Sequence, residues 1–205
     1  TLEAAYFGGA SRIILCDTNG AAFPDEVEKI VAELAPKYKN MLGIHCHDDC
    51  GMAVANSISA VRGGAVMIQG TLTGCGERCG NANLATVIGN LQTKMEHNVI
   101  GENLKNLTSA CVYVSDVANQ TLSPNAPYVG RNAFAHKGGM HIDAVCKEPS
   151  SFEHIPPETV GNKRRILVSE VSGKSAVYSK IQRLFPEIKK SDPSVAKITR
   201  RFKEL

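Results

Sequence analysis

The first hundred or so residues alternate three times between a short apolar segment and a longer segment with helical periodicity. The apolar segments, which are rich in β-branched residues, span residues 12–16, 42–47 and 66–70. The helical segments follow them, beginning near Pro24, Met52 and Asn83. Strands that are separated by helices of this length pair in parallel, because each helix returns the chain to the starting edge of the sheet. The sequence therefore predicts an α/β fold with a parallel sheet.

Polar loops follow all three predicted strands, at residues 17–20, 45–51 and 71–81. The carboxyl ends of parallel strands share one edge of the sheet, which is where ligands bind in such folds. His45 and His47 are two residues apart on one strand, so both side chains point to the same face. Asn81 ends the third loop and can reach the same point. We therefore predict a site with two imidazoles and a carboxamide.

Histidine and oxygen ligands are typical of a catalytic divalent ion, whereas thiolates dominate structural zinc sites. An isolated His-x-His pair has a simpler interpretation, with one histidine in the core and the other facing solvent. Asp48 and Asp49 follow the pair, and they could orient the imidazoles or cap the next helix. The glycine-rich loop one strand later favours a metal site over that simpler interpretation.

Composition excludes several classes of function. The formal net charge is only +3, with 23 basic and 20 acidic residues, which argues against nucleic acid as the main partner. No apolar segment approaches the roughly 20 residues that span a bilayer, and no signal peptide is visible. The 7 cysteines are an odd number, which favours reduced thiols and a cytoplasmic protein. Cys46 should face away from the two histidines and pack in the core.

The pattern changes after about Gly101. We predict a helix over 104–117, then a linker rich in Pro and Asn over 122–130. Two further helices are expected at the end of the chain, over 176–184 and 194–205. The predicted domains are 1–100, with the metal site, and 101–205, with small helical subdomains.

Two segments resemble one enzyme family. They are His45-Cys46-His47-Asp48-Asp49 and Gly74-Cys75-Gly76-Glu77-Arg78-Cys79-Gly80-Asn81. Together they resemble a signature of the 2-isopropylmalate, homocitrate and citramalate synthases, in the metal-dependent family that includes the hydroxymethylglutaryl-CoA lyases. The resemblance implies a TIM (β/α)8 barrel, of which this chain holds the last three strands, and so a fragment. Strand–helix alternation alone would also allow a doubly wound sheet.

The resemblance also implies roles for individual residues. His45, His47 and Asn81 would bind the divalent ion (Mg, Mn or Zn), with a carboxylate from outside this chain. Thr18 would bind the substrate carboxylate. From the residues themselves we interpret Glu77 and Arg78 as a pair that shapes their loop and contacts substrate. His141 and Asp143 would remove a proton from acetyl-CoA, given a pKa shifted upward. Phe152 stands where the family often has tyrosine.

The reaction implied by the resemblance is the condensation of acetyl-CoA with a 2-oxo acid in branched-chain amino-acid biosynthesis. Segments 129–139 and 161–170 most resemble citramalate synthases, which favours pyruvate as the oxo acid. The alternatives are a 2-isopropylmalate or homocitrate synthase, a hydroxyacyl-CoA lyase, or a structural fragment that is inactive alone. A homodimer is expected, because the family places the segment of His141 over the barrel of a neighbouring subunit.

Overall fold

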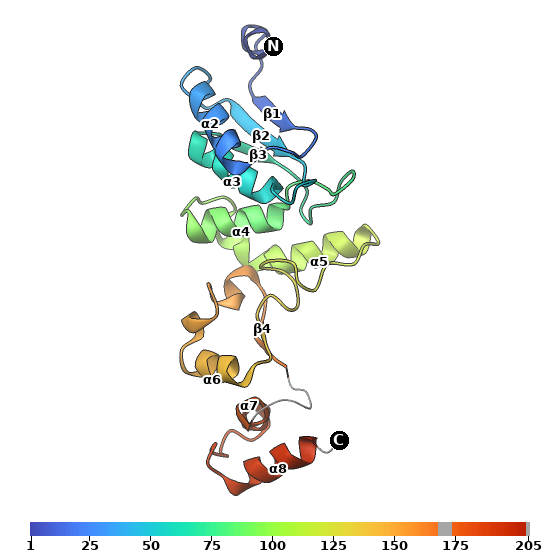
Figure 1. Ribbon diagram of the computed structural model, residues 1–205, viewed down its shortest axis with the longest axis vertical. Coiled ribbons are helices and arrows are strands. Elements are labelled where there is room, and N and C mark those ends of the chain that lie inside the picture. The colour runs from blue at the N-terminus through green and yellow to red at the C-terminus, as the bar shows by residue number, and fades with distance from the viewer. Residues whose placement is uncertain (168–173, 204–205) are drawn as a thin grey trace. The chain divides into compact units, whose positions relative to one another are not determined.

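The computed structural model describes residues 1–167 and 174–203 (Figure 1). The chain forms two compact units, which are described separately. The N-terminal unit contains Thr1–Glu102 and Ala110–Leu122, and the C-terminal unit contains Asn103–Ser109 and Ser123–Leu205. Segment 168–173 and residues 204–205 lie outside the described residues, and with them the end of the predicted final helix.

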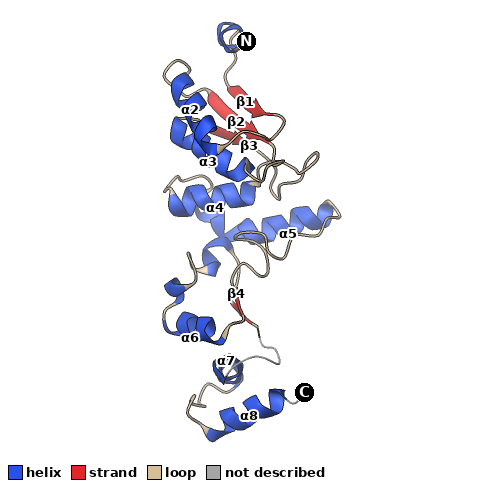
Figure 2. Ribbon diagram, viewed as in Figure 1, coloured by secondary structure: helices blue, strands red, loops and turns tan. Residues whose placement is uncertain are grey.

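The N-terminal unit is an alternation of strands and helices (Figure 2). Its elements are α1 (Leu2–Phe7), β1 (Ile13–Asp17), α2 (Pro24–Leu34), β2 (Leu42–Cys46), α3 (Ala53–Gly63), β3 (Met67–Gln69) and α4 (Leu84–Lys94). The three strands pair in the order β1-β2-β3, all parallel. The predicted parallel sheet is therefore confirmed, and each strand lies within one residue of its predicted start.

The core of this unit lies between the sheet and the helices α2 and α3, which pack side by side (Figure 1). Alternate residues of β2, at Leu42, Ile44 and Cys46, are at most 3% exposed. His45 has the opposite parity and faces the other side of the sheet. Full burial of such side chains contributes about 1.5–3 kcal/mol each, which fixes the register of the strand.

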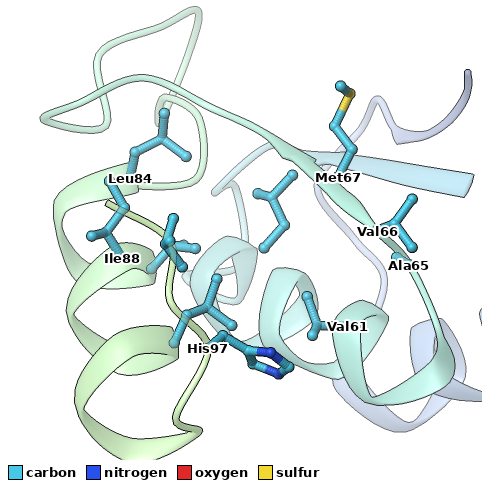
Figure 3. A pocket seen from close by; sticks show the side chains of 11 residues that line it. Val61, Ala65, Val66, Met67, Leu84, Ile88 and His97 are labelled. Carbon is cyan, nitrogen blue, oxygen red and sulfur yellow. The ribbon is translucent and has the colours of Figure 1, made fainter. Parts of the chain in front are cut away.

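The edge of the sheet at β3 is apolar and open. Among the described strands β3 pairs only with β2, and Val66 and Met67 are exposed. Figure 3 shows these side chains around a groove of about 550 Å³ between α3, β3 and α4. His97 lines the groove as well. An apolar open edge of this kind is where a parallel sheet continues in larger α/β folds.

The second half of the chain is mainly helical, as predicted. Its elements are η1 (Gly101–Asn106), α5 (Leu107–Val117), β4 (Ala135–His136), α6 (Gly139–Lys147), η2 (Pro149–Ser151), η3 (Pro157–Val160), β5 (Arg165–Ile166), α7 (Lys174–Leu184) and α8 (Pro193–Lys203). The chain passes from one unit to the other within η1, within α5 and again after Leu122. β4 and β5 form a short parallel pair that the helical prediction did not include. No described helix is long and apolar enough to cross a membrane.

Candidate metal centre and active site

The two predicted histidine ligands lie together at the carboxyl end of β2. The ring centroids of His45 and His47 are 5.0 Å apart. Asn81 joins them through an isolated antiparallel bridge with His47, and Ala82 N donates to Cys46 O at 3.0 Å. The loop after β3 therefore returns alongside the end of β2, which brings the three predicted ligands to one edge of the sheet.

Glycine residues allow the close packing that positions Asn81. A Cβ atom on Gly76 would lie 2.2 Å from Asn81 Nδ2, so no larger residue fits without displacing the amide. Asn81 Nδ2 donates a hydrogen bond to Cys75 O at 2.9 Å. That bond fixes the amide with its nitrogen toward the loop and leaves Oδ1 as the free acceptor.

His47 is oriented by a backbone carbonyl from the neighbouring strand. Its Nδ1 lies 3.1 Å from Asp17 O. Because a carbonyl oxygen can only accept a hydrogen bond, the proton of the imidazole must be on Nδ1. The other ring nitrogen of the neutral imidazole is then a lone-pair donor, as metal-binding histidines require.

The residues fit a divalent cation. His45 Nδ1 and Asn81 Oδ1 are both buried and have no hydrogen-bond partner. A buried polar atom without a partner costs about 1–3 kcal/mol, and a coordinated ion would remove that cost. Within the described parts of the chain, no group of three or more His, Cys, Asp and Glu residues could hold a metal. Within this chain, Asn81 is therefore the predicted ligand that joins the two histidines at this edge.

The two acidic residues after the histidines have different structural roles. Asp48 Oδ1 accepts from Ala53 N at 2.9 Å, at the start of α3. Of the two roles predicted for this residue, the structure shows the helix-capping one. Asp49 instead receives two hydrogen bonds from Arg78, Nε to Oδ1 at 2.8 Å and Nη2 to Oδ2 at 3.0 Å.

Arg78 ties together the loops that follow all three strands. Besides Asp49, its Nη2 donates to Thr18 O at 2.8 Å. Hydrogen bonding from Arg78 lowers the pKa of Asp49, and the left-handed backbone of Arg78, at φ 54°, aims the side chain across the loops. The predicted pair with Glu77 is loose, with Nη1 and Oε2 3.8 Å apart, while Asp49 provides the close contacts.

The other predicted substrate-binding groups are open to solvent. Thr18 is exposed beside this edge, and the side chain of Glu77 is 87% exposed. Their roles in binding stay predictions.

The predicted acid–base residues lie on α6, in the C-terminal unit. His141 is exposed, and its ring centroid is 4.4 Å from that of Phe152, with an angle of 31° between the planes. The ring that replaces the family tyrosine therefore packs directly on the predicted catalytic imidazole.

The electrostatic surroundings of Asp143 differ from those expected of a base. Its carboxylate accepts from Lys147 Nζ at 2.7 Å and also from Lys190. Hydrogen bonds from these two ammonium groups lower the pKa of Asp143 to about 2. We expected a base to have its pKa raised, so the expected direction of the shift is wrong for Asp143.

A buried ionic cluster in the C-terminal unit was not predicted. Glu153 is 5% exposed and accepts from His136 at 3.0 Å and from Arg164 at 2.7 Å. Burial opposes the charge of Glu153, but the hydrogen bonds from Arg164 and His136 lower its pKa overall. His154 packs against the rings of Tyr128 and Phe134.

The cysteines are all free, as expected for reduced thiols. Cys46 is fully buried, and burial is the main cause that raises its pKa to about 12. The prediction that Cys46 packs in the core is confirmed.

Comparison with known proteins gives two family matches. Residues 1–114 match the HMGL-like family, and residues 128–205 match the homocitrate synthase post-HMGL domain-like family. A curated relative from Aquifex aeolicus named (R)-citramalate synthase is 47% identical, over 100% of this chain and 39% of its own. A second relative named (R)-citramalate synthase, from Synechocystis, is 44% identical, again over 100% of this chain and 39% of its own. A probable 2-isopropylmalate synthase from Methanopyrus kandleri is 37% identical, over 99% of this chain and 40% of its own.

Solved structures support the same assignment. The hydroxymethylglutaryl-CoA lyase of Bacillus subtilis is 30% identical, with a TM-score of 0.52, over 59% of this chain and 42% of its own. This chain spans only about 39% of the length of the two citramalate synthases named above. The HMGL-like match over residues 1–114 covers more than half of the chain. The chain therefore belongs to the HMGL-like family and contains part of its TIM barrel.

Proposed function

We propose that the protein containing this chain condenses acetyl-CoA with pyruvate, with release of CoA after the thioester is hydrolysed by water. One observation carries this proposal: His45, His47 and Asn81 converge at the ligand edge, and two of them have buried atoms without partners. Relatives named (R)-citramalate synthase, 37–47% identical over nearly the whole chain, support pyruvate as the oxo acid.

In the proposed mechanism, His45, His47 and Asn81 would hold a divalent ion. When bound, such an ion supplies Lewis acidity to the keto oxygen of the oxo acid. The hydrogen bond from His47 Nδ1 to Asp17 O keeps the imidazole in the tautomer that binds a cation. The Cys75 carbonyl does the same for the amide of Asn81.

Substrate binding would use the loop edge that Arg78 stabilises. Thr18 provides a hydroxyl for the substrate carboxylate. The guanidinium of Arg78 donates to the carbonyl oxygen of Thr18 and so holds the backbone of Thr18 in place. The exposed carboxylate of Glu77 is the remaining candidate for contact with substrate. Fixing the loops before substrate binds lowers the entropy cost of orienting the oxo acid.

Proton removal from acetyl-CoA would fall to His141. Its imidazole is exposed and packs on Phe152, whereas the carboxylate of Asp143 is held by two lysines. Asp143 then acts as a positioning residue that holds α6. We assign the metal-binding part to residues 1–100 and the acid–base part to 101–205, with a homodimer as the expected assembly.

The test is an assay of free CoA release by the full-length protein with pyruvate, 2-oxoisovalerate or 2-oxoglutarate, together with metal analysis. Preference for pyruvate by at least tenfold in kcat/KM supports the proposal. Preference for 2-oxoisovalerate or 2-oxoglutarate would assign the chain to the 2-isopropylmalate or homocitrate synthases instead.

A lyase reaction is the second candidate, since the similar solved structure from Bacillus subtilis is a hydroxymethylglutaryl-CoA lyase. It would use the same metal ligands in the direction of carbon–carbon cleavage. Incubating the full-length protein with hydroxymethylglutaryl-CoA separates the two. Carbon–carbon cleavage of that substrate to acetyl-CoA and acetoacetate, without any condensation of acetyl-CoA, would replace the synthase proposal.

A further inference from the structure

A basic groove in the C-terminal unit is separate from the predicted site residues. It has a volume of about 820 Å³ and lies between the segment around β5 and helix α7. Its basic lining residues are Lys163, Arg164, Arg165, Lys180 and Arg183. Glu158 is the acidic residue that lines it. Neither the metal centre nor the acid–base segment uses any of these side chains.

The charge of Arg164 is already compensated within the protein. Its Nε and Nη2 donate to the two oxygens of buried Glu153, at 2.7 and 2.5 Å. Glu153 also contacts His136 of β4, the strand that pairs with β5. The ionic cluster therefore anchors the wall of the groove that contains β5, so that wall does not have to be ordered by a ligand.

The other four basic side chains of the groove have no ion pair with a described carboxylate. Glu158 offsets one of these four positive charges, so the groove has an excess of three. Lys180 and Arg183 are three residues apart on α7, so they share one helix face. Arg165 provides a cation from β5, on the other wall. Like charges that converge in this way repel each other until an anion binds between them.

The dimensions and chemistry of the groove indicate the class of ligand. Its volume is in the range of pockets for small molecules, which is about 300–1,000 Å³. Arginine and lysine are the usual partners of phosphate oxygens. Ile166 and Leu167 add apolar surface that a nucleoside could cover. We propose that this groove binds the phosphate groups of a small molecule that carries several of them.

Two sources share that chemistry. One is the 3′-phosphorylated adenosine diphosphate end of coenzyme A, which rests on the proposed function. The other is a free nucleotide that binds as an effector. Both present an adenosine and two or more phosphate groups, so their binding is compared in the experiment.

The experiment is calorimetric titration of the full-length protein with 3′-phosphoadenosine 5′-diphosphate and, separately, with ADP and ATP. The test variant is Lys180→Gln with Arg183→Gln. The control is Lys197→Gln with Arg200→Gln, which removes the same two residue types at the same spacing from exposed positions of α8. We expect the test variant to weaken binding about tenfold, at about 1.4 kcal/mol for each factor of ten, and the control to match the native protein.

Binding should also weaken as salt rises, because the cations are exposed. Preference for 3′-phosphoadenosine 5′-diphosphate identifies coenzyme A as the source, and preference for ATP identifies a nucleotide effector. The proposal would be overturned if the test variant bound these ligands as tightly as the native protein does. It would also be overturned if the native protein bound none of the three ligands. No turnover is needed in this titration, so it can succeed or fail independently of the condensation assay.

Discussion

Replacing Gly76 with alanine should weaken metal binding by displacing Asn81. The added Cβ would lie 2.2 Å from Asn81 Nδ2 and 2.9 Å from its Cγ. Ordinary contact begins near 3.4 Å, so the carboxamide must move by roughly 1 Å or more. Metal–oxygen bonds are only about 2.0–2.2 Å long, so a shift of this size removes the ligand from its position.

The size of the effect can be estimated from what fixes Asn81. The displaced amide loses its hydrogen bond to Cys75 O, a group that orients the ligand without touching the ion. Loss of such an orienting partner typically costs 10–100-fold in metal affinity, or about 1.4–2.7 kcal/mol. The backbone of Gly76 does not require glycine, since its φ is outside the positive region, so the effect is steric.

The assay is titration of the metal-free full-length protein with Mn²⁺ or Zn²⁺, with circular dichroism to check folding. Gly139→Ala is the matched control, because a Cβ there would meet nothing within 4 Å. The control should bind metal as the native protein does. If Gly76→Ala also keeps native affinity and a native spectrum, Asn81 is not a ligand and the metal centre described above is wrong.

Four further predictions concern the loops and α6. Arg78→Lys cannot make the bidentate contact with Asp49, so the KM for the oxo acid should rise several-fold in steady-state assays. Glu77→Gln should also raise that KM, because its exposed carboxylate is the candidate contact with substrate, and an unchanged KM would remove Glu77 from that role. Phe152→Ala should lower kcat, because His141 loses its packing partner, while the KM for the oxo acid stays constant. The depressed pKa of Asp143 stabilises the fold above the unfolded pKa of about 3.9, and this contribution disappears as pH falls toward about 2. Asp143→Asn should therefore melt at lower temperature than the native protein at pH 7, with the difference shrinking toward pH 2.

The sequence predicted the sheet and its ligand edge because both depend on local patterns. Apolar runs with β-branched residues located β1, β2 and β3 to within a residue, and parallel pairing followed from the helices between them. Strand alternation placed His45 and Cys46 on opposite faces, and burial of Cys46 agrees with it. These inferences need only the period of a strand and the direction of a crossover.

Contacts between distant residues could not be predicted in the same way. Arg78 and Asp49 are 29 residues apart, and Glu77 is the nearest acid in sequence, so pairing within the loop looked more favourable. The left-handed backbone of Arg78 turns its side chain toward the neighbouring loop instead. Nothing in the local pattern predicts a positive φ at a non-glycine residue.

The lysines around Asp143 show how this limit affects the proposed mechanism. Lys147 is four residues along α6 and its pairing could be predicted, but Lys190 is 47 residues away in sequence. With two ammonium groups on one carboxylate, the pKa of Asp143 falls instead of rising. A carboxylate of that low basicity is a poor acceptor for a carbon-bound proton, because efficient general bases have a pKa near the working pH. In the proposed mechanism the two groups would therefore have separate tasks: Asp143 links α6 to Lys190, and His141 would accept the proton.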